Sequence, residues 1–77
     1  PVKTIHYLIV PKQHIADFND LTNNDILVKL KHVAQKMIKE QKLNEKGYRL
    51  VINGGGAQVI YHLHIHLLGP LGKASKM

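Results

Sequence analysis

The alternating run from His62 to Leu67 (HLHIHL) constrains the fold of this chain more than any other feature. Residues i, i+2 and i+4 of a β-strand share one face, so the run predicts a strand with its imidazoles on one side and its leucine and isoleucine side chains in a core. We expect this strand to run from Ile60 to Leu68, because Gly69-Pro70 follows as a breaker. The solvent-facing side of a strand usually carries Lys, Thr or Glu, so a row of imidazoles there indicates a functional site.

Two further strands are predicted around this run. Ile5–Val10 is rich in β-branched and aromatic residues and ends at Pro11, and its apolar residues on both faces favour an interior strand. Arg49–Asn53 is the other strand, and the glycine triplet 54–56 forms a loop after it that permits positive φ angles. The segment between Lys12 and Asn19 is expected to be a loop.

A single long helix is predicted from about Asn23 to about Lys42. Thr22 and Asp25 resemble a capping box at its start, and Gly47 is a stop signal shortly after its end. The apolar side chains recur at helical spacing and form one broad stripe: Ile26, Leu30, Val33 and Met37, flanked by Leu27, Ala34 and Ile38. Three strands and one long helix make an α+β domain.

Composition limits the partners and the compartment. A chain of 77 residues allows one small domain, and the absence of cysteine excludes disulfides and thiolate metal sites. The net charge of +6 favours anionic partners, but a solvated helix face explains much of it, and scarce aromatic residues make nucleic acid an unlikely partner. Neither a membrane span nor a signal segment is evident, so a cytoplasmic protein is expected. The small core and the free sheet edges predict pairing with a second subunit.

Spacing along the histidine strand discriminates between two kinds of site. Neighbouring histidines on one face lie about 6.6–6.8 Å apart and the outer two about 13 Å apart, too far for all three to bind one metal at about 2.0–2.1 Å. A zinc site would therefore need two of the three and a further ligand such as His14. A row of imidazoles suits a phosphate chain better, since one ring can attack phosphorus while another donates a hydrogen bond or a proton. Backbone N–H groups of the glycine loop could approach the phosphate oxygens.

The motif His-φ-His-φ-His-φ-φ, with φ apolar, is the signature of the histidine triad (HIT) family, and His62–Leu68 resembles it without departure. The segment Ile5–Ile15 resembles the family strand that ends in Pro-Lys-x-His-Ile, and Gly47–Asn53 resembles the strand before its phosphate loop. The similarity is greatest to the Hint-like branch. It implies a small antiparallel sheet with one long helix packed on it.

The resemblance also implies a function and its residues. Members of this branch cleave at an α-phosphate, often of a purine nucleoside phosphoramidate, without a cofactor or metal. His64 would attack phosphorus and form a nucleotidyl-histidine, His62 would orient that ring through its backbone carbonyl, and His66 would contact the α-phosphate. His14 would lie near the leaving group. Nucleotide contacts would come from Asn53, Gly54, Gly55, Gly56 and Gln58. A homodimer is implied as well.

Departures from the family pattern keep a second hypothesis open. Val59 stands where Hint-like proteins commonly have Ser or Thr, and the loop after Asn53 is shorter than usual. We expect residues 1–70 to form a HIT-like domain without the family's usual amino-terminal part, which holds the ribose, and residues 71–77 to form a mobile tail. A nucleotide-binding module of the same fold with little turnover is therefore the alternative. His6 is expected to be structural and His32 solvated.

Overall fold

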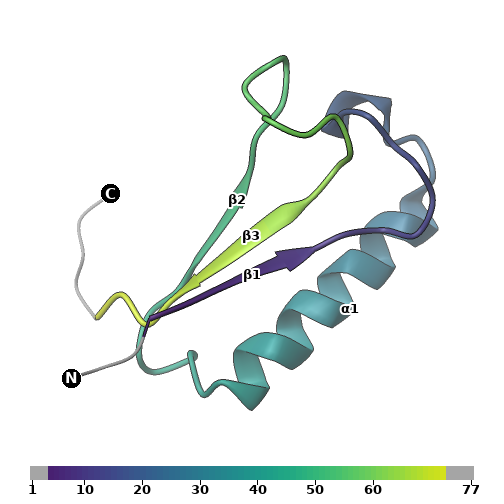
Figure 1. The fold of residues 1–77 in the computed structure, drawn as a ribbon. Helices are drawn as coiled ribbons and strands as arrows, with labels where there is room; N and C mark the ends of the chain where they lie inside the picture. Colours follow the sequence, from purple (N-terminus) through teal and green to yellow (C-terminus); the bar gives the residue numbers. More distant parts are fainter. Residues whose placement is uncertain (1–3, 73–77) are drawn as a thin grey trace.

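The computed structural model describes residues 4–72, which form a three-stranded antiparallel sheet with one long helix against it (Figure 1). In chain order the elements are β1 (Ile5–Ile9), the 3-10 helix η1 (Phe18–Asp20), α1 (Asn24–Glu40), β2 (Arg49–Ile52) and β3 (Ile65–Gly69). The predicted α+β class and the antiparallel sheet are confirmed. Within the described part of the chain, no helix combines the length and the apolar character that crossing a membrane requires.

Strand β3 lies in the centre of this sheet, between β1 and β2. Ile65 and Leu67 are buried and His66 is half-buried, so the predicted alternation holds. Leu67 is fully buried in a core that α1 closes from one side: Ile9, Ile15, Leu30, Ala34, Ile38, Leu43, Leu63, Ile65 and Leu67. The imidazoles of the motif therefore project from the opposite side of the sheet.

Two predictions about the strands were wrong. β1 lies at an edge of the described sheet, not in its interior. β3 begins at Ile65, not at Ile60, because its partner strand ends: Ile9 pairs with Ile65, and two residues later Pro11 has no N–H to continue the ladder. Leu63 N–H still donates to Ile15 O (2.6 Å), so the segment before β3 remains attached to the chain after β1.

Helix α1 lies within two residues of its predicted bounds, but other residues than those predicted set its ends. Its N-cap is Asn23, whose side chain accepts a hydrogen bond from Asp25 N–H at 2.9 Å, so the proposed capping box at Thr22 was wrong. The helix ends at Glu40 and not at a signal from Gly47, because Lys42 adopts φ +56° and Leu43 N–H donates back to Ile38 O at 2.9 Å. This turn sends Leu43 into the core.

The buried face of α1 is rotated relative to the predicted stripe. Leu30, Ala34 and Ile38 are buried, whereas Val33 and Leu27, both predicted to belong to the stripe, are exposed. Helical periodicity located the apolar side, but the sheet is too narrow to cover all of it.

The carboxylate of Asp17 holds the loop between β2 and β3 through hydrogen bonds. Asp17 accepts hydrogen bonds from Gly55 N–H (2.8 Å), Asn19 N–H (3.1 Å) and the Gln58 amide (3.1 Å). The bonds from Gly55 and Asn19 lower the pKa of Asp17 below 3.8, against a smaller opposing effect of desolvation. A Cβ on Gly54 would lie 2.8 Å from Asp17 Oδ1, so a larger residue at this position would displace the carboxylate from its hydrogen bonds.

The end of the described chain is tied to the turn before β2. Leu71 N–H donates to Gly47 O (3.0 Å) and Gly72 N–H to Lys46 O (2.8 Å), although both donors fall in the predicted mobile tail. The remainder of that predicted tail, residues 73–77, lies outside the described residues.

Replacing the N-cap should destabilise the protein, whereas replacing its neighbour should not. Asn23→Ala removes the acceptor for Asp25 N–H and should lower the free energy of unfolding by about 1 kcal/mol. Thr22→Ala is the matched control. Urea denaturation of both variants measures the difference, and an equal or larger loss in the Thr22 variant would contradict the assignment of the cap.

The hydrogen bonds that Asp17 accepts should make the free energy of unfolding depend on pH in the acid range. Because the pKa of Asp17 is lower in the folded than in the unfolded protein, the unfolded state binds more protons between the two values. The stabilisation by Asp17 is thus complete above about pH 4 and is lost as the pH falls through the folded pKa. Urea unfolding of the wild type and of Asp17→Asn should give a difference that shrinks in that window. Asp20→Asn removes a carboxylate from the short helix that Asp17 caps, and an identical pH dependence for both variants would contradict this role.

Candidate active site

Five histidines from three segments form a continuous row, in the order His14, His62, His64, His66 and His6. Below we call these residues the histidine row. Three ring pairs connect it, with centroid distances of 5.1, 4.8 and 4.9 Å, and a backbone hydrogen bond connects His62 to His64. The row thus brings together all four histidines that the sequence predicted as site residues, and it adds His6.

The ring of His64 is held by the backbone of the residue two positions before it. Its Nδ1 lies 2.7 Å from His62 O, and a carbonyl oxygen can only accept, so Nδ1 carries the proton. In the neutral ring, Nε2 is then left with its lone pair. This hydrogen bond is the contact that the family resemblance implies for the pair.

His62 is fixed at the other end of the row by the chain after β1. Its Nε2 lies 3.0 Å from Pro11 O and therefore donates to it. The ring of His14 meets His62 edge-on, at an interplanar angle of 86°. Because Pro11 also ends the β1 ladder, the same residue stops the strand and positions the first histidine of the motif.

His66 is paired with His6 across the sheet. Nε2 of His6 lies 2.7 Å from Nδ1 of His66, and the rings are tilted by 37°. Burial is the main cause that lowers the pKa of His66 below 6.5, and the nearby His64 and His6 lower it further. His66 thus favours its neutral form. The contact with His6 was missed in the sequence, because it depends on the register between two strands far apart in the chain.

The predicted nucleotide-contacting residues do not all have free polar groups. Asn53 is exposed. Gly55 N–H and Gly56 N–H donate to Asp17 and to Gln58 Oε1 (2.9 Å), so both glycine donors already have partners within the protein. The side chain of Gln58 is only 6% exposed and also donates to Ala16 O at 3.3 Å. A phosphate contact from the backbone N–H of Gly55 or Gly56 would therefore replace an existing hydrogen bond.

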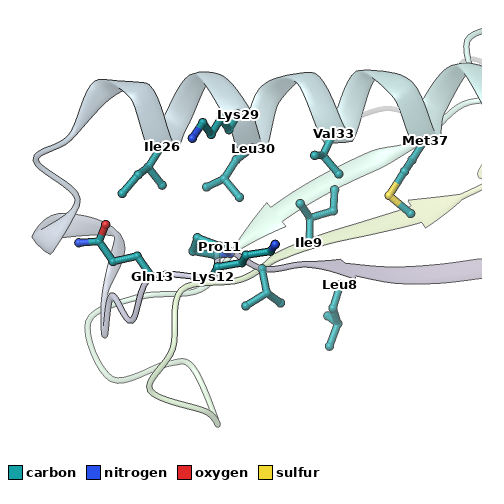
Figure 2. A pocket seen from close by; sticks show the side chains of 11 residues that line it. Leu8, Ile9, Pro11, Lys12, Gln13, Ile26, Lys29, Leu30, Val33 and Met37 are labelled. Carbon is teal, nitrogen blue, oxygen red and sulfur yellow. The ribbon is translucent and has the colours of Figure 1, made fainter.

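A groove of about 680 Å³ lies between β1 and α1, and none of its lining residues is a histidine (Figure 2). Figure 2 shows Ile26, Leu30, Val33 and Met37 descending from the helix toward Ile9. Its lining is mainly apolar, with Lys12, Gln13 and Lys29 as the polar members, and the row lies outside it. The groove reflects the open edge of β1, where Leu8 and Val10 are about half exposed.

Among residues 4–72, no three His, Cys, Asp or Glu side chains are arranged as a group that could hold a metal ion. His62 and His64 each use one ring nitrogen on a backbone carbonyl, and His66 uses Nδ1 on His6.

Comparison with known proteins gives matches along almost the whole chain. The family model described as HIT domain matches residues 1–72. An uncharacterized HIT-like protein of Chlamydia trachomatis is 43% identical over 74 residues, which cover 90% of this chain and 65% of the relative. An uncharacterized HIT-like protein of Buchnera aphidicola subsp. Baizongia pistaciae is 41% identical over 73 residues, which cover 90% of this chain and 65% of the relative. The chain therefore spans slightly less than two thirds of the length of these curated relatives.

Solved structures agree with the sequence matches. A HIT family hydrolase from Clostridium thermocellum superimposes with a TM-score of 0.81 at 40% identity, covering 95% of this chain and 67% of that one. A HIT family hydrolase from Legionella pneumophila gives a TM-score of 0.76 at 43% identity, and the match covers 94% of this chain and 64% of that one. Together with the intact motif and the geometry of the row, these matches show that the chain belongs to the HIT domain family.

Proposed function

We propose that this protein is a nucleotide hydrolase that cleaves at the α-phosphate through a nucleotidyl-histidine intermediate on His64. Its substrates would be purine nucleoside phosphoramidates or related nucleotidyl compounds, and it would need neither cofactor nor metal. Related solved structures are named HIT family hydrolases, which supports hydrolysis as the reaction class.

One observation carries the proposal: the hydrogen bond from Nδ1 of His64 to His62 O. It leaves Nε2 of the neutral ring as a nucleophile, and it compensates the positive charge that the ring gains when Nε2 bonds to phosphorus. A carbonyl is well suited to this purpose because it cannot take the proton away from Nδ1.

The reaction then proceeds in two balanced steps. Nε2 of His64 forms a bond to the α-phosphorus, the bond from phosphorus to the leaving nitrogen breaks, and the departing amine takes up one proton from solvent. Water then attacks the same phosphorus, the N–P bond breaks, the attacking water gives up one proton to solvent, and the nucleoside monophosphate leaves with His64 restored. Neutral His66, adjacent to His64 at 4.8 Å between ring centroids, would donate a hydrogen bond to a phosphate oxygen. His14, at the end of the row, would lie on the leaving-group side.

We further propose that the protein acts as a homodimer. Both β1 and β2 are edges of the described sheet, and the exposed apolar residues Leu50 and Ile52 lie on β2. Pairing through such an edge would cover apolar area and unpaired backbone groups together. Sedimentation equilibrium of the purified protein tests this assembly.

A nucleotide-binding module with little turnover is the second candidate, and two observations favour it. Val59 is 94% exposed and has no donor where the family commonly has Ser or Thr. Asp17 occupies Gly55 N–H and adds a negative charge beside the loop. Calorimetric binding of a purine nucleoside monophosphate, without turnover of the phosphoramidate, would support this candidate.

Removing the imidazole of His64 should abolish turnover. His64→Ala should reduce the rate of adenosine phosphoramidate hydrolysis by about a thousandfold or more, because no other group forms the covalent bond. His32→Ala removes an exposed histidine on α1 and serves as the control, with unchanged rates. Product release followed by chromatography measures both.

Two results would overturn the proposed mechanism. Equal rates for the wild type and His64→Ala would exclude His64 as the nucleophile. Activity that is lost after treatment with a strong chelator and restored by zinc would instead favour a zinc site among the histidines.

A further inference from the structure

We propose that Asp17 is an autoinhibitory residue: its carboxylate occupies hydrogen-bond donors of the loop between β2 and β3 that would otherwise bind a phosphate group of the nucleotide. Binding of that phosphate requires Asp17 to release the backbone N–H of Gly55 and the side-chain amide of Gln58. This inference rests on the proposed function, because it names what limits phosphate binding at the same site.

Two donors of the loop converge on a single oxygen of Asp17. The backbone nitrogen of Gly55 lies 2.8 Å from Oδ1, and Nε2 of Gln58 lies 3.1 Å from the same atom. The other oxygen, Oδ2, accepts from Asn19 N–H at 3.1 Å and caps η1. The two oxygens therefore have separate tasks, one on the loop and one on the short helix.

The loop presents these donors in the manner of an anion-binding site. Gly55 and Gly56 have φ angles of +64° and +95°, and backbone N–H groups in such turns can surround an anion. Gly56 N–H holds Oε1 of Gln58 at 2.9 Å, so the donor end of the amide faces Asp17. The hydrogen bond from Gly55 is the main cause that lowers the pKa of Asp17, so this environment favours a negative charge. A phosphate oxygen accepts charge-assisted hydrogen bonds in the same way.

The space that Oδ1 occupies suits an oxygen atom and belongs to the neighbourhood of the histidine row. A Cβ on Gly54 would come within 2.8 Å of Oδ1, so the glycine leaves that space free for an oxygen. Asp17 is three residues after His14, and Gln58 is four residues before His62. An extended chain spans at most about 3.6 Å per residue, so the Cα atoms of these pairs lie within about 11 Å and about 14 Å.

Occupied donors weaken phosphate binding in two ways. The phosphate must displace a carboxylate of the same chain, so only the fraction of molecules in which Asp17 is released binds with full affinity. A carboxylate that stays close also repels the phosphate. Removing its charge should therefore strengthen phosphate binding, although it weakens hydrogen bonds within the folded protein.

Two variants of Asp17 separate its charge from its occupation of the donors. Asp17→Asn keeps the size and one acceptor oxygen but removes the charge. Asp17→Ser keeps a side-chain cap for η1, but its hydroxyl is one bond shorter and releases the loop. Asp20→Asn removes one negative charge from η1 and is the matched control for net charge. Urea denaturation shows whether each variant is folded, and the isosteric Asn variant decides if the Ser variant does not fold.

Calorimetric titration with adenosine monophosphate (AMP), and separately with inorganic phosphate, measures the binding. The dissociation constant for AMP should fall by about tenfold in Asp17→Asn and by at least as much in Asp17→Ser, because one charge-assisted contact no longer has to be displaced. It should stay unchanged in Asp20→Asn. Inorganic phosphate should show the same order of affinities, because the proposal concerns the phosphate group alone.

A ¹H–¹⁵N correlation spectrum locates the bound phosphate. AMP should shift the backbone amide signal of Gly55 and the side-chain amide signals of Gln58, and it should do so at lower concentration in the Asp17 variants. Neither measurement needs turnover. The predicted gain in AMP affinity without hydrolysis of adenosine phosphoramidate would therefore contradict the proposed function and leave the role of Asp17 intact.

Four results would overturn the proposal. Equal or weaker AMP binding in both Asp17 variants would show that the carboxylate does not compete with the phosphate. An equal gain in Asp20→Asn would trace the effect to net charge. Signals of Gly55 and Gln58 that stay unshifted at saturating AMP would exclude these donors. Absence of AMP binding in every variant would do the same, because the released donors should bind the anion.

Discussion

The position of β3 between two antiparallel neighbours is the constraint on which the rest of this structure depends. Central placement buries Leu67 completely and leaves only one side of the strand for polar side chains. A shift of the register by one residue would bury the imidazoles and expose the leucines, which the core would not tolerate. The same pairing that stabilises the fold therefore also brings His66 against His6 and sets the row of imidazoles along the sheet.

The ends of the strands contribute as much to the site as the strands themselves. Pro11 ends the ladder of β1 and offers its carbonyl to His62, and the irregular segment before β3 lets His62 offer its own carbonyl to His64. In a regular strand that carbonyl would be directed toward a neighbouring strand. The departure from regular pairing is thus what allows the backbone to hold the His64 ring in one tautomer.

Sequence patterns predicted the elements and most of the histidine row, and failed where tertiary neighbours decide. Alternation identified the buried face of the segment 62–67, and the family motif identified His64 and its carbonyl partner. The edge position of β1, the contact between His6 and His66, and the hydrogen bonds of Asp17 to the glycine loop all depend on pairing between distant segments, which no local pattern contains. The glycine triplet suggested free phosphate donors, but a carboxylate from another loop already uses one of them.

The central claim is that Nε2 of His64 becomes covalently bound to the α-phosphorus during turnover. Rapid mixing with an adenosine phosphoramidate, quenching in alkali where a phosphohistidine bond survives, and peptide mass spectrometry would test it most directly. We predict a nucleotidyl group on His64 that appears before the steady state and disappears when substrate is exhausted. Product formation with the group on another histidine, or with no modified peptide at any time, would contradict the account.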